Sequence, residues 1–250
     1  MSSPVMDTPL PTATPPPPPR TRYGVLRAVG AGVTGLLVLA GATSALPELV
    51  TSSQLRDLGW APDTVELQVE GAVGEVRVRE GGDPSIMLTQ TWAFHEPKTT
   101  VDSINGVTKV FMDCSNGFLR RCNGDWDIIV PSGTKVVVRS SFGDIALRDL
   151  TGDVVVAGSV GDVDVTGAPA SLDVQTSLGD VTAHLGEPAE SVRVQTNIGD
   201  ITVIVPDTVS YAVQARSELA TPTPKVRQDP ASPYTIDVSS DIGEIQVSNE

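Results

Sequence analysis

The stretches Gly158-Ser-Val-Gly-Asp-Val163 and Thr176-Ser-Leu-Gly-Asp-Val181 decide the fold of this chain. The glycines at positions 143, 161, 179 and 199 are separated by 18, 18 and 20 residues. A fixed period near this length is typical of stacked repeats, in which each unit buries its apolar face only against its neighbours. The other copies are Ser140-Ser-Phe-Gly-Asp-Ile145, Thr196-Asn-Ile-Gly-Asp-Ile201 and Ser240-Asp-Ile-Gly-Glu-Ile245, with a shorter form at Ala72-Val-Gly-Glu-Val76.

Each repeat carries the pattern of two strands. After Gly-Asp, apolar and polar residues alternate, as at Val181, Ala183 and Leu185, and a second alternating pair follows at Val192 and Val194. An apolar period of two, rich in valine and isoleucine, indicates strands that are buried on one face. We therefore predict an all-β domain, a β-solenoid-like stack with two strands in each rung of 18–20 residues.

The Gly-Asp pair is predicted to form the corner between the two strands. Leu178 precedes Gly179, and the next apolar residue, Val181, follows three places later. Because three is odd, both side chains face the core only if the chain bends between them. Glycine adopts left-handed φ easily, and a short aspartate can accept a local backbone N–H. The other residues before the glycines are Phe142, Val160 and Ile198, and the predicted corner residues are Gly74, Gly143, Asp144, Gly161, Asp162, Gly179, Asp180, Gly199, Asp200 and Gly243.

The equivalent aspartates could also form a cation-binding row. In directly stacked rungs their carboxylates would lie about 4.8 Å apart, and Ca²⁺ would relieve the repulsion between them. The repeats lack the paired glycines and the second aspartate of Ca²⁺-binding nonapeptide repeats. We interpret the row as turn chemistry, keep Ca²⁺ as the alternative, and predict no cofactor.

Residues 63–250 are predicted to form one extracytoplasmic β-solenoid domain, with a less regular first part. No segment in this range resembles a linker, and about 190 residues suffice for an independent core. The strands expected in the less regular part are 65–69, 76–78, 86–91, 107–111 and 126–130.

The chain before residue 63 divides into three parts. Residues 1–22 are rich in proline and are predicted to be a disordered cytoplasmic tail, followed by a transmembrane helix at 23–46 and a linker at 47–62. The uncharged stretch Ala28–Leu46 would be about 28 Å long as a helix, and arginines precede it, which favours a cytoplasmic N-terminus. The alternative is a signal peptide that is cleaved after Ala42 or Ala45, which would release a secreted domain.

Two cysteines, Cys114 and Cys122, lie in one short polar segment. In an exported domain such a pair most simply forms a disulfide bond. A zinc site would need more ligands, and the only histidines in the sequence are His95 and His184.

Charge excludes one class of partner. Residues 63–250 contain 28 Asp and Glu against 13 Lys and Arg, a balance of −15. Nucleic-acid binding requires a basic surface, so we predict no nucleic-acid partner. The same charge repels anionic lipid headgroups, so the domain is expected to stand off the membrane that its N-terminal helix enters.

An enzyme is the alternative to an interaction module. A solenoid polysaccharide lyase would use acidic and basic residues on an outer face, for which the candidates are Asp164, Asp173, Arg148 and Arg193. Surface ion pairs between neighbouring strands explain these residues equally well. No nucleophile elbow, phosphate-binding loop or metal-binding helix motif occurs in the sequence, so we predict that the protein is not an enzyme.

The order of motifs resembles a bacterial adhesin-like family whose β-rich domain is called the toastrack domain. The matching features are a short leader, one membrane span, Gly74-Glu75-Val76, a two-cysteine segment, Val130-Pro-Ser-Gly133 and the Gly-Asp repeats, over roughly residues 63–250. The resemblance implies a non-enzymatic envelope domain, found alongside membrane-stress and signalling modules, with no catalytic residues. We therefore expect an adhesion, scaffold or envelope-stress interaction module whose partner is an envelope protein or a glycan.

Overall fold

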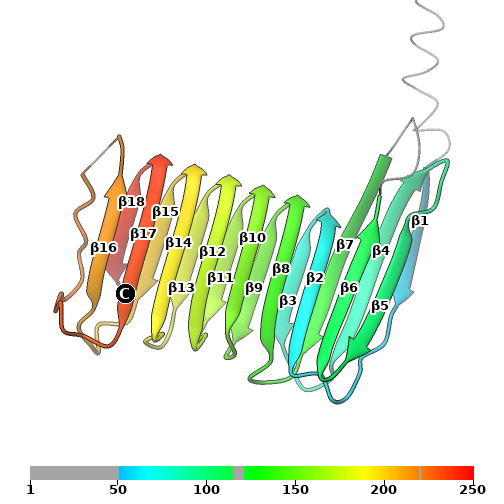
Figure 1. Ribbon diagram of the computed structural model, residues 1–250, viewed down its shortest axis with the longest axis horizontal. Helices are drawn as coiled ribbons and strands as arrows, with labels where there is room; N and C mark the ends of the chain where they lie inside the picture. The colour runs from blue at the N-terminus through cyan, green and yellow to red at the C-terminus, as the bar shows by residue number, and fades with distance from the viewer. Residues whose placement is uncertain (1–50, 115–120, 220) are drawn as a thin grey trace, which may run out of the picture. The chain divides into compact units, whose positions relative to one another are not determined.

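The computed structural model describes residues 51–114, 121–219 and 221–250, and this part of the chain is all-β without helices. It forms two sheets of nine strands each (Figure 1). The strand order is β1-β4-β7-β3-β9-β11-β13-β15-β18 in one sheet, called sheet A here, and β16-β17-β14-β12-β10-β8-β2-β6-β5 in the other, called sheet B. The strands are β1 (Thr51–Asp57), β2 (Glu66–Val73), β3 (Val76–Glu80), β4 (Ser85–Ala93), β5 (Lys98–Ile104), β6 (Val107–Asp113), β7 (Arg121–Val130), β8 (Lys135–Phe142), β9 (Ile145–Leu150), β10 (Val154–Val160), β11 (Val163–Gly167), β12 (Ser171–Leu178), β13 (Val181–Leu185), β14 (Ser191–Ile198), β15 (Ile201–Val205), β16 (Ala212–Ser217), β17 (Thr235–Ile242) and β18 (Ile245–Asn249).

The repeats form parallel rungs, each with one strand in sheet B and one in sheet A. Equivalent residues lie side by side, so that Val174 of β12 pairs with Val156 of β10 and with Val194 of β14. The strand pairs β2–β3, β8–β9, β10–β11, β12–β13, β14–β15 and β17–β18 are the rungs that carry the glycine motif. The all-β stack with two strands in each rung is therefore confirmed.

Alternation of apolar and polar residues places the core between the two sheets. In β13, Val181, Ala183 and Leu185 are fully buried, whereas Thr182 is exposed. The same pattern runs through every rung, which produces one continuous cluster of buried valine, isoleucine and leucine side chains. Burial of this apolar area is the main favourable term in folding.

The N-terminal end of the stack combines parallel and antiparallel pairing. The rung β6–β7 lies beside β2–β3 through parallel pairing of β6 with β2 and of β7 with β3. β4 then pairs antiparallel with β7, and β5 pairs antiparallel with β6. The rung β2–β3 is thus inserted between β6–β7 and β8–β9, although it comes first in the sequence.

The prediction of a linker at 47–62 is wrong over residues 51–57, which form β1 at the edge of sheet A. β1 pairs antiparallel with β4 from Thr51, opposite Ala93, to Asp57, opposite Met87. Almost all of its side chains are exposed, so the segment lacks the apolar alternation that marks a strand. β1 is therefore stabilised by backbone hydrogen bonds to the free edge of β4 rather than by burial of its own side chains.

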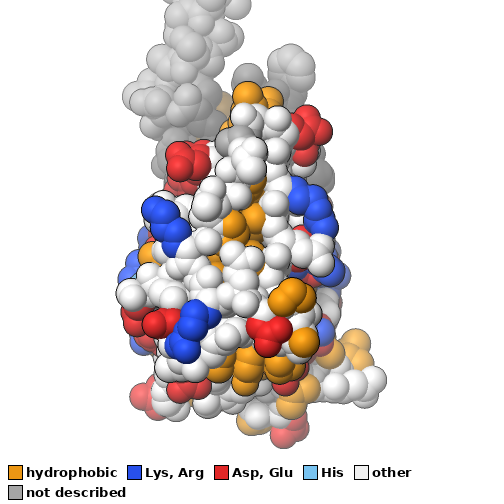
Figure 2. All heavy atoms as spheres, turned by 90° about the vertical axis from the view of Figure 1, so that its left-hand side faces the viewer, with side chains coloured by type: hydrophobic (Ala, Val, Ile, Leu, Met, Phe, Trp, Pro, Cys, Tyr) orange, Lys and Arg blue, Asp and Glu red, His pale blue; other side chains and the backbone are white. Residues whose placement is uncertain are grey.

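The segment between β15 and β17 covers the C-terminal end of the stack. β16 adds a parallel strand beyond β17, and the backbone N–H of Lys225 donates to Val247 of β18 at 2.7 Å. Tyr211 is buried, and its hydroxyl donates to the carbonyl of Pro206 at 2.9 Å. Toward this end, apolar side chains are visible in a band between two polar flanks (Figure 2).

The sulfur atoms of Cys114 and Cys122 form a disulfide bond that joins the end of β6 to β7. The bond closes the connection between the two strands of one rung. Residues 115–120 lie outside the described part of the chain.

Replacing both cysteines by serine is expected to lower the free energy of unfolding by about 2–3 kcal/mol, because the bond closes a short loop in the unfolded chain. Urea denaturation of the wild type and of the C114S/C122S variant measures this difference. A reducing agent should lower the stability of the wild type by a similar amount and leave the variant unchanged. Equal stability of the two oxidised proteins would contradict the prediction.

Glu80, the last residue of β3, holds the turn that joins β9 to β10. Its Oε2 accepts hydrogen bonds from the backbone N–H of Thr151 at 3.1 Å and from the Thr151 hydroxyl at 2.7 Å. Burial raises the pKa of Glu80, but hydrogen bonds from Ser132, Thr151 and Gly133 outweigh burial, so the pKa lies below its ordinary value of 4.5.

A carboxylate with a lowered pKa stabilises the fold above its unfolded-state pKa, and this contribution disappears as the pH falls through the folded-state pKa. The wild type should therefore be more stable than the Glu80→Gln variant at neutral pH, and the difference should shrink as the pH falls below about 4.5. Thermal denaturation of both proteins across this range measures the effect. A difference in Tm that stays constant with pH would refute the assignment.

The predicted tail at 1–22 and the predicted span at 23–46 lie outside the described residues. Within residues 51–114, 121–219 and 221–250, no helix has the length and apolar character needed to cross a bilayer.

Candidate interaction surface

The glycine corners stack into a column along one edge of the two sheets. Gly161, Gly179 and Gly199 have φ values of +137°, +144° and +147°, a region that glycine alone occupies without strain. The backbone N–H of each donates to the residue before the next glycine, as from Gly179 to the carbonyl of Ile198 at 3.0 Å. A Cβ atom at Gly179 would lie only 2.6 Å from the carbonyl carbon of Gly161. The corner therefore requires glycine both for conformation and for space.

The corner aspartates link each rung to the next. Oδ1 of Asp144 accepts the backbone N–H of Asp162 at 3.0 Å, and Oδ1 of Asp162 accepts that of Asp180 at 2.9 Å. The series continues from Asp180 to the N–H of Asp200 at 2.8 Å, and from Asp200 to that of Glu244 at 2.7 Å. The aspartate is thus the acceptor for an N–H group of the following rung, rather than for one of its own turn.

A row of buried hydroxyl groups supports the corners from inside. Thr196 donates to the carbonyl of Gly179 at 3.3 Å, and Ser240 donates to that of Gly199 at 3.0 Å. Ser140 donates to the carbonyl of Ala72, two residues before the corner glycine Gly74, at 3.2 Å. These residues were not predicted from the sequence, although a serine or threonine three places before the glycine recurs in most repeats.

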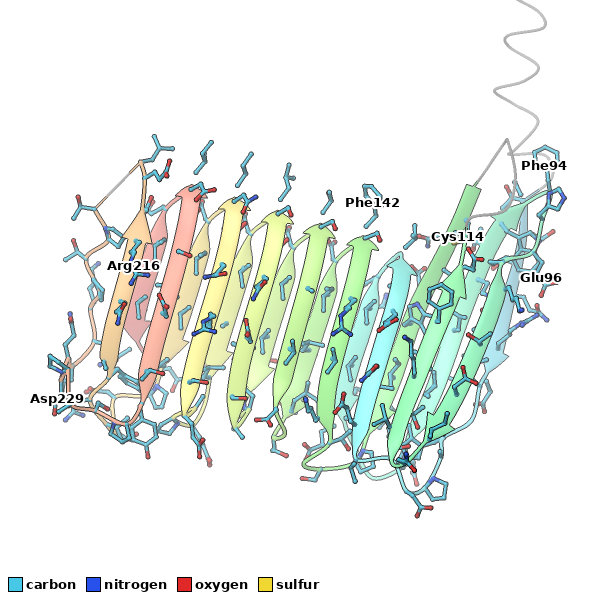
Figure 3. The ribbon with its side chains drawn as sticks, viewed as in Figure 1. Phe94, Glu96, Cys114, Phe142, Arg216 and Asp229 are labelled. Atoms are coloured by element: carbon cyan, nitrogen blue, oxygen red, sulfur yellow. A yellow bond between two sulfur atoms is a disulfide. The ribbon has the colours of Figure 1, made fainter. Side chains whose placement is uncertain are left out.

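The expectation that the residues before the glycines face the core is wrong. Phe142 is 57% exposed and Leu178 is 48% exposed, and both side chains lie outside the two sheets. The buried hydroxyl and the stacked glycine backbone fill the interior at the corner, so the last residue of each strand extends beyond it. Figure 3 shows Phe142 projecting past the end of β8, in line with side chains at the ends of the following strands. We call this row the corner ridge; it consists of Phe142, Val160, Leu178, Ile198 and Ile242.

β7 contains a further copy of the motif that was not predicted from the sequence. Gly124 and Asp125 precede the alternating residues Trp126 and Ile128, and Oδ1 of Asp125 accepts the backbone N–H of Glu75 at 3.1 Å. Asp125 therefore accepts a backbone N–H of rung β2–β3, in the same way that Asp144 accepts one of rung β10–β11. The order Gly-Asp-apolar-polar-apolar could have revealed this copy, but it lies outside the regular period.

Glutamate replaces the corner aspartate at two positions. Oε1 and Oε2 of Glu75 accept hydrogen bonds from Arg77 at 2.6 and 2.5 Å, and the Glu75 hydrogen bond raises the pKa of Arg77 above its ordinary value. Glu244 occupies the last rung in sheet A, where no further rung requires an acceptor. Aspartate thus occurs where the carboxylate joins two rungs.

The four residues proposed for a lyase site are divided between the two sheets. Arg148 of β9 and Asp164 of β11 lie in sheet A, whereas Asp173 and Arg193 face each other across β12 and β14 in sheet B. The structure therefore does not bring the four together in one site. The two histidines are also apart: His184 Nε2 lies 2.6 Å from Oε1 of Glu250, and His95 follows β4 in a turn.

The described residues contain no group of three or more His, Cys, Asp or Glu side chains that could hold a metal ion. The aspartate row already has a structural use, since each Oδ1 accepts a backbone N–H. We therefore expect the same melting temperature in about 1 mM Ca²⁺ and in excess EDTA, because no site in the row gains ligands from folding. Differential scanning calorimetry measures this, with magnesium as a control for ionic strength. A rise in Tm with Ca²⁺ alone would support the cation row instead.

Comparisons with known proteins find one family. A sequence profile described as Toastrack DUF4097 matches residues 112–247, just over half of the chain. No protein among those with curated functions matches.

Solved structures of three candidate adhesion proteins are similar to the chain. A candidate cell adhesion protein from Clostridium sporogenes is 12% identical, with a TM-score of 0.48 over 80% of this chain and 100% of that one. A candidate adhesin from Bacteroides fragilis is 15% identical, with a TM-score of 0.44 over 80% and 97% of the two chains. A candidate adhesin from Parabacteroides merdae is 13% identical, with a TM-score of 0.36 over 80% and 96%.

Proposed function

Because this chain belongs to the Toastrack DUF4097 family, we propose that it is a non-enzymatic interaction module of the cell envelope, acting in adhesion, as a scaffold or in the response to envelope stress. Its partner would be an envelope protein or a glycan. The corner ridge is the observation that carries this proposal.

The corner ridge differs from the scattered apolar residues of an ordinary protein surface. Its five members occupy the same position in successive rungs and pair in register, as Val160 does with Leu178 and Leu178 with Ile198. Apolar side chains that are contiguous, exposed and bordered by polar residues mark interaction sites. Hydrogen bonds from rung to rung fix the spacing of these side chains, so they are preorganised for a partner.

The proposal places the domain outside the cytoplasmic membrane, on a single N-terminal span. The uncharged stretch Ala28–Leu46 and the arginines before it support this orientation. Thr51 begins β1 at the edge that carries the glycine corners, because it pairs with Ala93, which pairs with Arg121 at the start of β7. The chain therefore enters the described domain along the same edge of the sheets as the corner ridge, at the far N-terminal side of sheet A.

Protease digestion of intact cells tests the orientation. A protease added from outside should degrade the domain and leave a tag at the N-terminus protected. Protection of the domain in intact cells, with digestion only after lysis, would place it in the cytoplasm and overturn the localisation.

Site-specific photo-crosslinking in intact cells tests the interaction itself. A benzoylphenylalanine in place of Leu178, on the corner ridge, should capture a discrete envelope component, whereas the same group in place of Gln195, on the open face of β14, should not. Equal capture at the two positions, or none at either, would refute the proposed use of the ridge.

A further inference from the structure

A second row runs beside the corner ridge for its whole length. It consists of the residues that follow the glycines, and all of them are exposed: Asp144, Asp162, Asp180, Asp200 and Glu244. We call it the carboxylate row. A single glycine separates each of its members from a member of the ridge, as Gly179 separates Leu178 from Asp180. Every rung from β8–β9 to β17–β18 thus offers one apolar side chain and one carboxylate.

The border on the other side of the ridge is almost uncharged. The residues before the ridge members are Ser141, Ser159, Ser177, Asn197 and Asp241, and all are exposed. Four of these five positions are neutral and polar. The ridge is therefore bordered by negative charge on one side only, the side on which the strands of sheet A begin.

The carboxylate row keeps its negative charge at the surface. Among the described residues, no Lys or Arg forms an ion pair with a member of the row, in contrast to Glu75, which Arg77 engages. The hydrogen bonds between rungs use Oδ1 of each aspartate as the acceptor. Like charges repeated at each rung repel one another, and a cationic partner relieves that repulsion.

We propose that the corner ridge and the carboxylate row together bind a cationic amphipathic segment of a partner protein. Its apolar side chains pack on the ridge, and Lys or Arg residues along one border of its apolar face lie over the carboxylate row. From Phe142 to Ile242 the ridge spans four steps between rungs, about 19 Å. An amphipathic helix of about 13 residues has this length.

Charge and area favour this occupant over the two alternatives. A second copy of the chain would bring one carboxylate row against another acidic surface, and the like charges would repel. The five side chains of the ridge also offer far less area than the roughly 800 Å² per partner that a stable protein–protein interface buries. Anionic lipid headgroups would be repelled by the same carboxylates. A helix that is basic on one border complements both rows and needs only a narrow contact.

The inference rests on the proposed interaction function and adds the chemistry of the partner. The probe is a synthetic 14-residue peptide of leucine and lysine with a helical apolar stripe, and two control peptides carry glutamate for lysine or serine for leucine. The full chain is immobilised in phosphatidylcholine nanodiscs, with empty discs as the reference. Surface plasmon resonance then gives the affinity.

Two sets of substitutions separate the rows. Leu178→Ser with Ile198→Ser removes apolar surface, and affinity for the leucine–lysine peptide should fall at least about tenfold. Asp162→Asn, Asp180→Asn and Asp200→Asn remove three charges while the amide oxygen still accepts the N–H of the next rung. This triple variant should keep its Tm, lose affinity about tenfold and lose most of the salt dependence.

Matched variants away from the two rows control for general effects. Leu55→Ser removes a leucine of β1 that is even more exposed than Leu178, and the variant carrying Asp83→Asn, Glu187→Gln and Glu190→Gln removes three charges elsewhere on the surface. Both should bind the peptide as the wild type does. Equal losses in the control variants and in the row variants would overturn the proposal, as would equal binding of the glutamate peptide.

Three further outcomes would identify another occupant or none. Binding of anionic vesicles that depends on the ridge would indicate a lipid surface, and a dimer that Leu178→Ser dissociates would indicate a second copy. Either result overturns the inference. Failure of the peptide to bind, together with capture of a partner from position 178 in cells, would reject the cationic segment and leave the proposed function standing.

Discussion

Replacing Gly179 by alanine is expected to destabilise the protein by about 3 kcal/mol or more. The φ of Gly179 is +144°, where an L-residue is strained, and the added Cβ would overlap the carbonyl group of Gly161. Because that carbonyl belongs to the backbone of a stacked rung, no side chain can move aside to make room. Urea denaturation of the wild type and the variant measures the difference.

Two glycines outside the column provide controls. Gly82 has an ordinary φ and open space around its Cα, so Gly82→Ala should change stability by less than about 0.5 kcal/mol. Gly133 has a φ of +74° with nothing within 4 Å of an added Cβ, so Gly133→Ala isolates the cost of conformation from that of overlap. If Gly179→Ala were as stable as Gly82→Ala, the column of stacked corners would be wrong.

Replacing Trp126 by alanine is expected to cost about 3–5 kcal/mol, because it leaves a large cavity in the core. Trp126 is completely buried and lies in β7 between Val76 of β3 and Leu88 of β4. It thus packs where the parallel rungs meet the antiparallel strands. The loss should appear in urea denaturation followed by far-ultraviolet circular dichroism.

Trp92 provides the comparison, since it lies near the C-terminal end of β4 and is only half-buried. Trp92→Ala should cost clearly less than Trp126→Ala, because less apolar area and a smaller cavity are involved. Equal losses in the two variants would mean that Trp126 does not occupy the core.

The repeat period and the corner conformation could be predicted because both depend on local chemistry. Alternation in segments such as Val181–Leu185 specifies which side chains are buried, and the glycine before each aspartate specifies a bend. Positive φ values at Gly161, Gly179 and Gly199 agree with that reasoning. The pairing of identical positions follows, since equal repeats that stack directly must align their glycines.

The orientation of the corner ridge could not be predicted from spacing alone. The odd interval between Leu178 and Val181 predicts a bend only if both side chains face the core, and it does not reveal that stacked glycine backbone fills the corner. The buried hydroxyl groups and the glycine backbone of neighbouring rungs fill the corner only in the assembled sheets, and Leu178 therefore lies outside. The candidate interaction surface therefore became visible only with the structure.

The order of the strands at the N-terminal end of the stack also could not be predicted from the sequence. β7 lies between β3 and β4, so the chain returns to a position between two strands that precede it in the sequence. The polar segment Thr51–Asp57 joins this end through backbone bonds, which no side-chain pattern records. Long-range pairing of this kind depends on the free edges that the other strands leave.

Disulfide trapping between neighbouring rungs tests the stacked arrangement most directly. Gln175 and Gln195 pair in register and are exposed, so their Cα atoms lie about 4.8 Å apart, a separation that a disulfide can span. Gln195 pairs in turn with Ser239, which puts Gln175 and Ser239 two rungs apart, about 9.6 Å. After oxidation and peptide mapping, we expect a cross-link in the Gln175→Cys/Gln195→Cys variant and none in Gln175→Cys/Ser239→Cys. The reverse result, or equal cross-linking of both pairs, would contradict the stacked arrangement.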